Sequence, residues 1–152
     1  PARLDRRTKN LVRRLTPEDV AIIDHTDLDR VSAEELIESG VRVVVNIAQS
    51  QTGRFPNPGP LLLVRGGVRL IEAPDAPLFD DVDEGELLTV RGASLFRNGT
   101  FLASGRALEA EELEAALAEQ RSRVTDALES FADLLATGIG RRPCGRRKLR
   151  LL

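Results

Sequence analysis

The strongest constraint on the fold is a regular alternation of short apolar segments with helical ones in the first half of the chain. Residues 20–23, 41–47 and 68–71 are rich in Val and Ile, as expected for buried strands. Residues 32–39 and 61–65 have the composition of short helices. Strands that alternate with helices pair in parallel through right-handed crossovers. This part of the chain therefore predicts a β-α-β-α-β layer.

The helix expected at residues 32–39 carries signals at both ends. Ser32 and Glu35 form the pattern of a capping box, in which Ser32 is the N-cap and Glu35 reaches back to its amide. Gly40 stands where a left-handed residue commonly ends a helix.

A different pattern follows in the second half. Short strands are expected at residues 87–90, 94–97 and 100–103, and Asn98-Gly99 is a strong hairpin signal. An antiparallel layer next to a parallel one predicts an α/β fold: a compact β/β/α domain of the swivelling type, spanning residues 20–106, followed by a long amphipathic C-terminal helix.

Residues 107–137 form the longest helical pattern of the chain. Six apolar side chains recur at spacings of 4, 7, 4, 3 and 4 residues and so share one face. They are Leu113, Leu117, Val124, Leu128, Phe131 and Leu135. A 30-residue helix is about 45 Å long, so we expect it to project and to pair with a second copy in a homodimer or with a coiled-coil partner. The alternative is a helix folded back over the β layer.

Charge is distributed unevenly along the chain. The formal net charge is -2, yet the first 14 residues contain six basic groups and residues 141–150 contain six more with no acid. We therefore separate a basic N-terminal segment, residues 1–19, and a basic tail, residues 138–152, which we expect to be disordered. Basic ends on an acidic body suggest contact with phosphate, a membrane surface or the body itself; simple solvation is the alternative.

Composition excludes several classes of function. One cysteine, Cys144, cannot form an internal disulfide, and together with the single histidine it provides too few ligands for a metal or Cys/His site. The chain has five Phe and no Trp or Tyr, so the stacking platform of single-strand binding is missing and nucleic acid is not an expected partner.

No segment approaches the roughly 20 apolar residues of a membrane span and no signal-peptide pattern opens the chain, so we expect a cytoplasmic protein. The sequence identifies no cofactor.

Polar residues follow two of the predicted strands. A cluster of carboxylates with the only histidine follows the first strand, and a loop of amides, hydroxyls, glycine and arginine, stiffened by prolines, follows the second. The carboxyl ends of parallel strands meet at one edge of the sheet, where ligands bind in such folds. The candidate ligand-binding residues are Asn46, Ser50, Thr52, Gly53, Arg54, Asn57, Gly59, Asp24, His25 and Asp27.

Two interpretations of these residues stay open. In the first, Gly53 and Arg54, with the nearby hydroxyls, cradle a phosphate or another small anion. The loop does not end in Lys-Ser/Thr, so a P-loop enzyme is not supported. In the second, Arg54 pairs with the aspartates after the first strand and both loops form a structural network. An enzyme in which Asp24, His25 and Arg54 act on a phosphorylated substrate is the alternative function.

Four motifs carry a family resemblance: residues 5–11 (DRRTKNL), 23–33 (IDHTDLDRVSA), 45–46 (VN) and 50–60 (SQTGRFPNPGP). Together they resemble the N-terminal region of the SteA-type bacterial cytokinetic ring proteins, often catalogued as thiamine-pyrophosphokinase-like, over residues 3–135. The family loop reads Ser-Ile-Ser-Gly-Arg-Tyr-Pro-Asn. Gln51, Thr52 and Phe55 depart from it, although Thr52 keeps a hydroxyl and Phe55 keeps the ring.

The resemblance implies a binding and assembly role in septation. It places the protein on the cytoplasmic side of the division septum, with a membrane-anchored coiled-coil partner that helps to control cell separation. It also implies a C-terminal pyrophosphokinase-like domain and a membrane segment, which we do not expect in this chain. No kinase activity is therefore carried over, and we do not expect this chain to be an enzyme.

Overall fold

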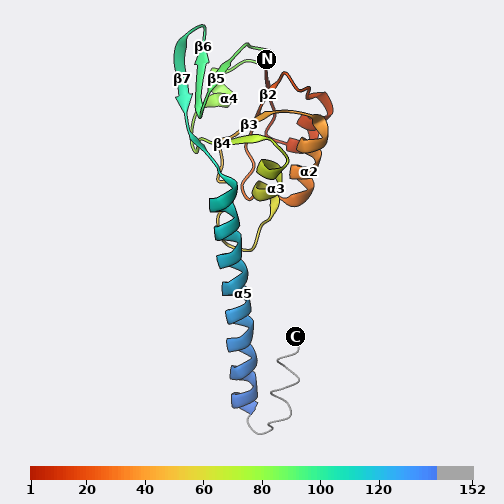
Figure 1. Cartoon of the computed structure of the whole chain (residues 1–152), viewed down its shortest axis with the longest axis vertical. Helices are drawn as coiled ribbons and strands as arrows, with labels where there is room; N and C mark the ends of the chain where they lie inside the picture. The colour runs from red at the N-terminus through yellow and green to blue at the C-terminus, as the bar shows by residue number, and fades with distance from the viewer. Residues whose placement is uncertain (140–152) are drawn as a thin grey trace.

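The computed structural model describes residues 1–139, and its centre is a five-stranded sheet, sheet A (Figure 1). Its strands are β1 (Ala2–Leu4), β2 (Val20–Ile23), β3 (Val43–Asn46), β4 (Arg69–Glu72) and β8 (Arg106–Ala107), in the spatial order β1-β2-β3-β4-β8. The first four strands pair in parallel, and β8 pairs antiparallel with β4. The predicted parallel layer is therefore present, with one strand added at each edge.

Short helices connect the parallel strands. The connection from β1 to β2 contains α1 (Thr8–Leu11) and the 3₁₀ helix η1 (Val12–Arg14). Helix α2 (Arg30–Ser39) joins β2 to β3, and α3 (Gly59–Arg65) joins β3 to β4. A further helical turn, α4 (Leu78–Asp81), follows β4. Helices α2 and α3 contact each other on the same side of the sheet (Figure 1).

An antiparallel sheet, sheet B, covers the opposite face. It consists of β5 (Thr89–Arg91), β6 (Ser94–Arg97) and β7 (Thr100–Ser104), in the order β5-β6-β7. Asn98 and Gly99 join β6 to β7 with φ of 50° and 79°, the left-handed pair that a two-residue hairpin loop requires. The predicted meander is confirmed.

The alternating side chains of sheet A supply two hydrophobic cores. In β2, Ala21 and Ile23 belong to the core under the helices, whereas Val20 and Ile22 belong to the core shared with sheet B. A strand buried on both faces requires apolar residues at every position, which is why β2 reads as an unbroken apolar run. The order helices, sheet A, sheet B is the β/β/α arrangement predicted from the sequence.

The start of α2 differs from the predicted capping box. The N-cap is Asp29, whose Oδ1 accepts a hydrogen bond of 2.9 Å from the backbone N–H of Ser32. The helix thus begins two residues before Ser32, which lies at the N3 position, so the prediction that Ser32 is the N-cap was wrong. Asp29 is the N-cap because its extended backbone places the carboxylate over the first turn of the helix. The C-cap prediction is confirmed, since Gly40 has φ 81°.

The N-terminal segment also differs from the expectation. Residues 1–19 are expected as a separate basic segment, but Ala2–Leu4 forms the edge strand β1 of sheet A, in which Ala2 pairs with Val20. Ala2 is fully buried. The start of the basic segment is thus part of the domain, because the exposed edge of β2 offers backbone hydrogen bonds that a helix could not use.

Helix α5 (Ala110–Ile139) leaves the domain and extends away from it (Figure 1). Its first turns contact α3 and carry Leu113 and Leu117 into the helix-side core. The predicted long helix is present. The expected disordered tail falls on residues 138–152, of which 140–152, including Cys144, lie outside the described residues.

Candidate functional site

The loops that follow β1, β2 and β3 meet at one edge of sheet A. These parallel strands end at Leu4, Ile23 and Asn46, and both predicted polar loops begin there. The expectation that the two loops share an edge follows from the register, in which Ile23 lies opposite Asn46.

Asn46 ties these loops together from a fully buried position. Its Nδ2 donates to the backbone oxygen of His25 at 2.9 Å and to Oγ of Ser50 at 2.8 Å. Its Oδ1 accepts from the backbone N–H of His25 at 3.0 Å and of Ala48 at 3.1 Å. An asparagine amide has two donor hydrogens and two acceptor lone pairs, so its capacity is fully used. Asn46 is a structural bridge and has no hydrogen bond left for a ligand.

Ser50 and Asn57 are also buried and hydrogen-bonded within the fold. Ser50 is fully buried, and its N–H donates to Oε2 of Glu72 at 3.0 Å. Asn57 is 2% exposed; its Nδ2 donates to the backbone oxygen of Ser50, and its Oδ1 accepts from the N–H of Gly59 at 3.0 Å. These bonds satisfy the backbone of a loop that passes through the interior.

Asp27 and Thr52 join the two loops at their surface. Both carboxylate oxygens of Asp27 are used, one accepting from the N–H of Thr52 at 2.8 Å and the other from its hydroxyl at 2.9 Å. Gly59 is required by packing, because a Cβ there would lie 2.0 Å from the backbone oxygen of Leu28. For these residues the contacts match the structural-network interpretation.

Arg54 does not pair with the aspartates that follow β2, as the structural-network interpretation expected. It is exposed, and its backbone N–H donates to Oγ1 of Thr52 at 3.3 Å. Among residues 1–139 its guanidinium forms no ion pair with an aspartate. Asp24 is paired with Arg6 instead, and Asp29 caps α2. Gly53, with φ 86°, lies beside the side chains of Gln120 and Arg123 of α5.

Asp24 and His25 contact side chains of the segment that follows β1. The hydroxyl of Thr8 lies 2.9 Å from Nδ1 of His25. Arg6 donates to Oδ2 of Asp24, and its guanidinium carbon lies 4.4 Å from the centre of the Phe79 ring. His25 is thus oriented by the turn that follows β1, and the resemblance motif DRRTKNL is placed beside the motif IDHTDLDRVSA.

These residues line a surface cleft of about 390 Å³, which we call the basic cleft. Its lining residues are Arg6, Arg7, Thr8, Lys9, Asp24, His25, Thr26 and Ser32. Arg54 is absent from this group, so the trio Asp24, His25 and Arg54 of the enzyme alternative does not line this cleft. Arg7, Thr8 and Lys9 were missed as site residues; the signal was the basic N-terminal charge, which the sequence could not place beside His25.

Asp29 borders the same region and is held ionised. Burial alone raises the pKa of its carboxyl, but hydrogen bonds from the hydroxyl and the N–H of Ser32, with the charge of His25, lower the pKa below its usual value. Its negative charge is therefore committed to the start of α2.

A smaller pocket of about 270 Å³ lies between the second loop and α5. It is lined by Gln49, Gln51, Thr52, Gly53, Glu72, Arg106, Leu108, Glu112, Leu113, Ala116 and Gln120. Gln120 is 5% exposed, and its Oε1 has no hydrogen-bond partner within the described residues. Thr52 and Gly53 of the predicted site line this pocket, whereas no local pattern in the sequence predicts the part of its wall that comes from α5.

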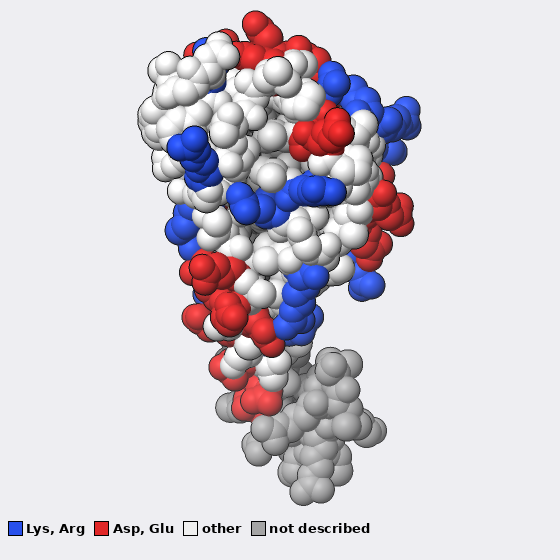
Figure 2. Space-filling model, turned by 45° about the horizontal axis from the view of Figure 1, so that its top comes forward, with Lys and Arg blue, Asp and Glu red and all other residues white. Residues whose placement is uncertain are grey.

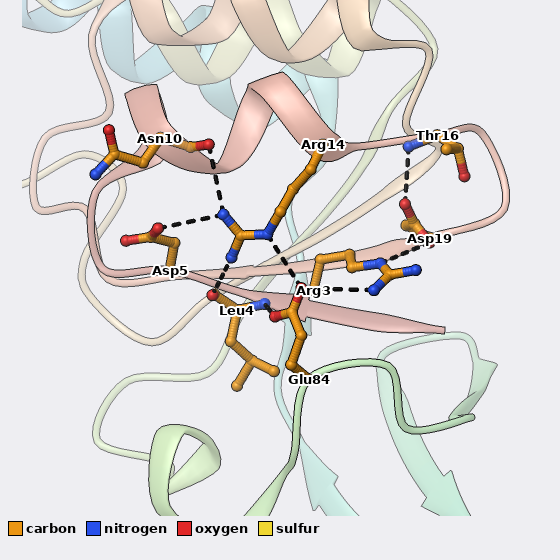
Figure 3. A network of polar contacts seen from close by, with 8 residues as sticks. All are labelled: Arg3, Leu4, Asp5, Asn10, Arg14, Thr16, Asp19 and Glu84. Atoms are coloured by element: carbon orange, nitrogen blue, oxygen red, sulfur yellow. Dashed lines mark hydrogen bonds and ion pairs between the residues drawn. The ribbon is translucent and has the colours of Figure 1, made fainter.

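Other basic N-terminal residues hold the domain together (Figure 3). Arg14 donates to the backbone oxygen of Leu4 at 2.7 Å and to Glu84 at 3.1 Å, and Glu84 accepts from the N–H of Leu4 at 2.9 Å. Arg3 lies 3.4 Å from Asp19 and 3.5 Å from Glu84. Burial raises the pKa of Glu84, but the hydrogen bonds from Arg14 and Leu4 and the nearby positive charges lower it below its usual value. This network fastens β1 to the segment before sheet B.

The predicted interface stripe of α5 is divided into two parts. Leu113 and Leu117 are 4% and 5% exposed and pack in the domain's own core, so they are not available to a partner. Val124, Leu128 and Phe131 are 42%, 56% and 58% exposed, and Leu135 is half-buried. The division arises because only the first two to three turns of the helix lie against the domain.

Comparison with protein-family models, with curated proteins and with solved structures finds no match to this chain. Within residues 1–139, no helix combines the length and the apolar character that crossing a membrane requires. Over the same range, no three His, Cys, Asp or Glu side chains gather in a group that could hold a metal ion.

Proposed function

We propose that this chain is a binding and assembly module of the bacterial division machinery that forms a homodimer through the distal part of α5. The observation that carries the proposal is the exposed apolar face formed by Val124, Leu128 and Phe131 on a helix that extends beyond its own domain (Figure 1). Contiguous apolar surface of this kind marks interaction sites in proteins.

The apolar face continues the seam that already packs in the core. Leu117 and Val124 lie seven residues apart, and Leu128 and Phe131 continue the same face with spacings of 4 and 3. This is the spacing of a coiled-coil seam. The base of the helix is fixed by its core contacts, so the distal face is presented with little loss of conformational entropy on binding.

The acidic residues of the exposed part of α5 lie away from the apolar face. Asp126, Glu129 and Asp133 share the face of Ser122, opposite Leu128, so burying the apolar face against a second copy leaves these charges in solvent. A two-fold axis lets the same apolar face of each copy cover that of the other.

The resemblance to the SteA-type proteins supports the cellular setting. In this proposal the dimer acts at the division septum and engages a membrane-anchored coiled-coil partner. The buried Asn46, Ser50 and Asn57 support a non-catalytic role for the second loop, since their polar groups are used within the fold.

The test is the solution mass of the chain and two variants by sedimentation equilibrium. Leu128→Glu places a charge at the centre of the apolar face, and we expect it to convert the dimer to a monomer. Ser122→Glu adds the same charge on the opposite face of the same helix and should leave the dimer intact. A monomeric parent chain at all concentrations, or equal dissociation of both variants, would refute the dimer.

The division role needs a separate measurement in cells. A fluorescent fusion of the parent chain is expected at the septum, and the Leu128→Glu fusion should be dispersed while the Ser122→Glu fusion stays in place. Uniform distribution of the parent fusion would reject the septal role without affecting the solution dimer.

A further inference from the structure

The basic cleft contains two cations that the fold does not use. Arg7 and Lys9 are exposed, and within residues 1–139 their side chains take part in no ion pair or hydrogen bond. Three other basic residues of this segment are paired within the fold: Arg3 and Arg14 with Glu84, and Arg6 with Asp24. The cleft therefore brings together two cations of the N-terminal segment that are unpaired within the described part of the chain.

Arg6 completes the positive side of the cleft in a fixed position. Its guanidinium is held between the carboxylate of Asp24 and the face of the Phe79 ring, 4.4 Å from the ring centre. This pairing neutralises Asp24, and Asp29 is committed to the N-H of Ser32. The two nearby carboxylates are thus occupied, and Arg7 and Lys9 leave an excess of positive charge.

Neutral hydrogen-bond donors complete the cleft. Thr8 is 3% exposed, and its hydroxyl lies 2.9 Å from Nδ1 of His25. When this hydroxyl donates to Nδ1, the proton of the neutral ring lies on Nε2. Nε2 is then the ring nitrogen that donates to a ligand. Thr26 and Ser32 add hydroxyl groups to the lining.

We infer that the basic cleft binds a small phosphoryl anion, with Arg7 and Lys9 as its charged contacts and His25 as a hydrogen-bond donor. Arginine and lysine are the side chains that proteins use for phosphate oxygens. A volume of about 390 Å³ lies in the range of small-ligand sites, roughly 300–1,000 Å³.

The charge pattern of the surface agrees with this location. Figure 2 shows a cluster of Asp and Glu side chains along the first part of α5, whereas on the globular domain Lys and Arg side chains lie among Asp and Glu side chains. The pocket beside α5 is lined by two carboxylates, Glu72 and Glu112, and its cation, Arg106, is already paired with Glu112. This disfavours the pocket beside α5 as the anion site and favours the cleft at the other end of the sheet edge.

The experiment is calorimetric titration of the full chain with inorganic phosphate and with pyrophosphate at constant ionic strength. We expect pyrophosphate to bind more tightly, because two phosphoryl groups reach Arg7 and Lys9 together. The double variant Arg7→Gln/Lys9→Gln should lose at least tenfold in affinity. Both side chains are exposed, so the fold is expected to persist, and circular dichroism checks this.

Arg13→Gln is the matched control. Arg13 is exposed, belongs to the same basic segment and does not line the cleft. Its affinity should stay within about twofold of the parent chain. Absence of binding by either anion at millimolar concentration, or an equal loss in Arg13→Gln and in the double variant, would overturn the site and leave only general attraction to a basic surface.

Discussion

Replacing Leu117 by Ala tests whether the base of α5 is part of the domain. The side chain is 5% exposed in the helix-side core. The substitution removes three buried carbon atoms, and their lost hydrophobic free energy is about 2.4 kcal/mol at ~0.8 kcal/mol per buried group. The cavity that is left behind destabilises the fold further. We expect a loss of about 3 kcal/mol in the free energy of unfolding, equivalent to about 9 °C in Tm for a chain of this size.

Leu128→Ala is the comparison for that experiment. It removes the same atoms from the same helix, but Leu128 is 56% exposed. In dilute protein, where self-association does not contribute, its cost should stay below about 0.5 kcal/mol. Urea unfolding followed by circular dichroism measures both variants. Equal losses, or a loss below about 1 kcal/mol for Leu117→Ala, would show that Leu117 is not seated in the core.

Two further predictions concern the loops and the N-terminal network. Gly59→Ala places a Cβ 2.0 Å from the backbone oxygen of Leu28, and we expect a loss of at least about 3 kcal/mol in urea unfolding; a near-neutral result would contradict the close approach. Folding lowers the pKa of Glu84, so ionised Glu84 stabilises the folded state. This contribution is fully present at a pH above the pKa that Glu84 has in the unfolded chain, and it is lost as the pH falls through the pKa of the folded state. Glu84→Gln should therefore flatten the fall in stability between about pH 5 and 3, and an unchanged acid profile would refute this.

Local patterns in the sequence were sufficient for the two layers of strands. The apolar runs of the parallel strands and the Asn98-Gly99 turn depend on residues close in the chain. Strand β1 was missed because its three residues have no period to detect, and only pairing with β2 makes them a strand. The N-cap of α2 was predicted at Ser32 instead of Asp29 because serine and aspartate are both favoured N-cap residues, so residue type alone does not decide between them.

The candidate site was predicted less completely. The sequence placed the two polar loops at one edge, but it could not show that Asn46 uses all its hydrogen-bonding groups inside the protein. It also could not distinguish the buried half of the α5 stripe from the exposed half, because Leu117 and Leu128 look alike in a periodic pattern. Both distinctions depend on contacts between segments far apart in the chain.

Helix α5 is held in the core at its base, and its far end extends away from the domain. Beyond Leu117 the helix continues for about 22 residues to Ile139, or roughly 33 Å at 1.5 Å per residue. A tilt of about 10° at the base would move the far end by roughly 6 Å over that length. Gly53 of the second loop lies beside Gln120 and Arg123, just beyond the fulcrum. A change in that loop that tilted the base of α5 would therefore produce a larger displacement at the far end of the helix.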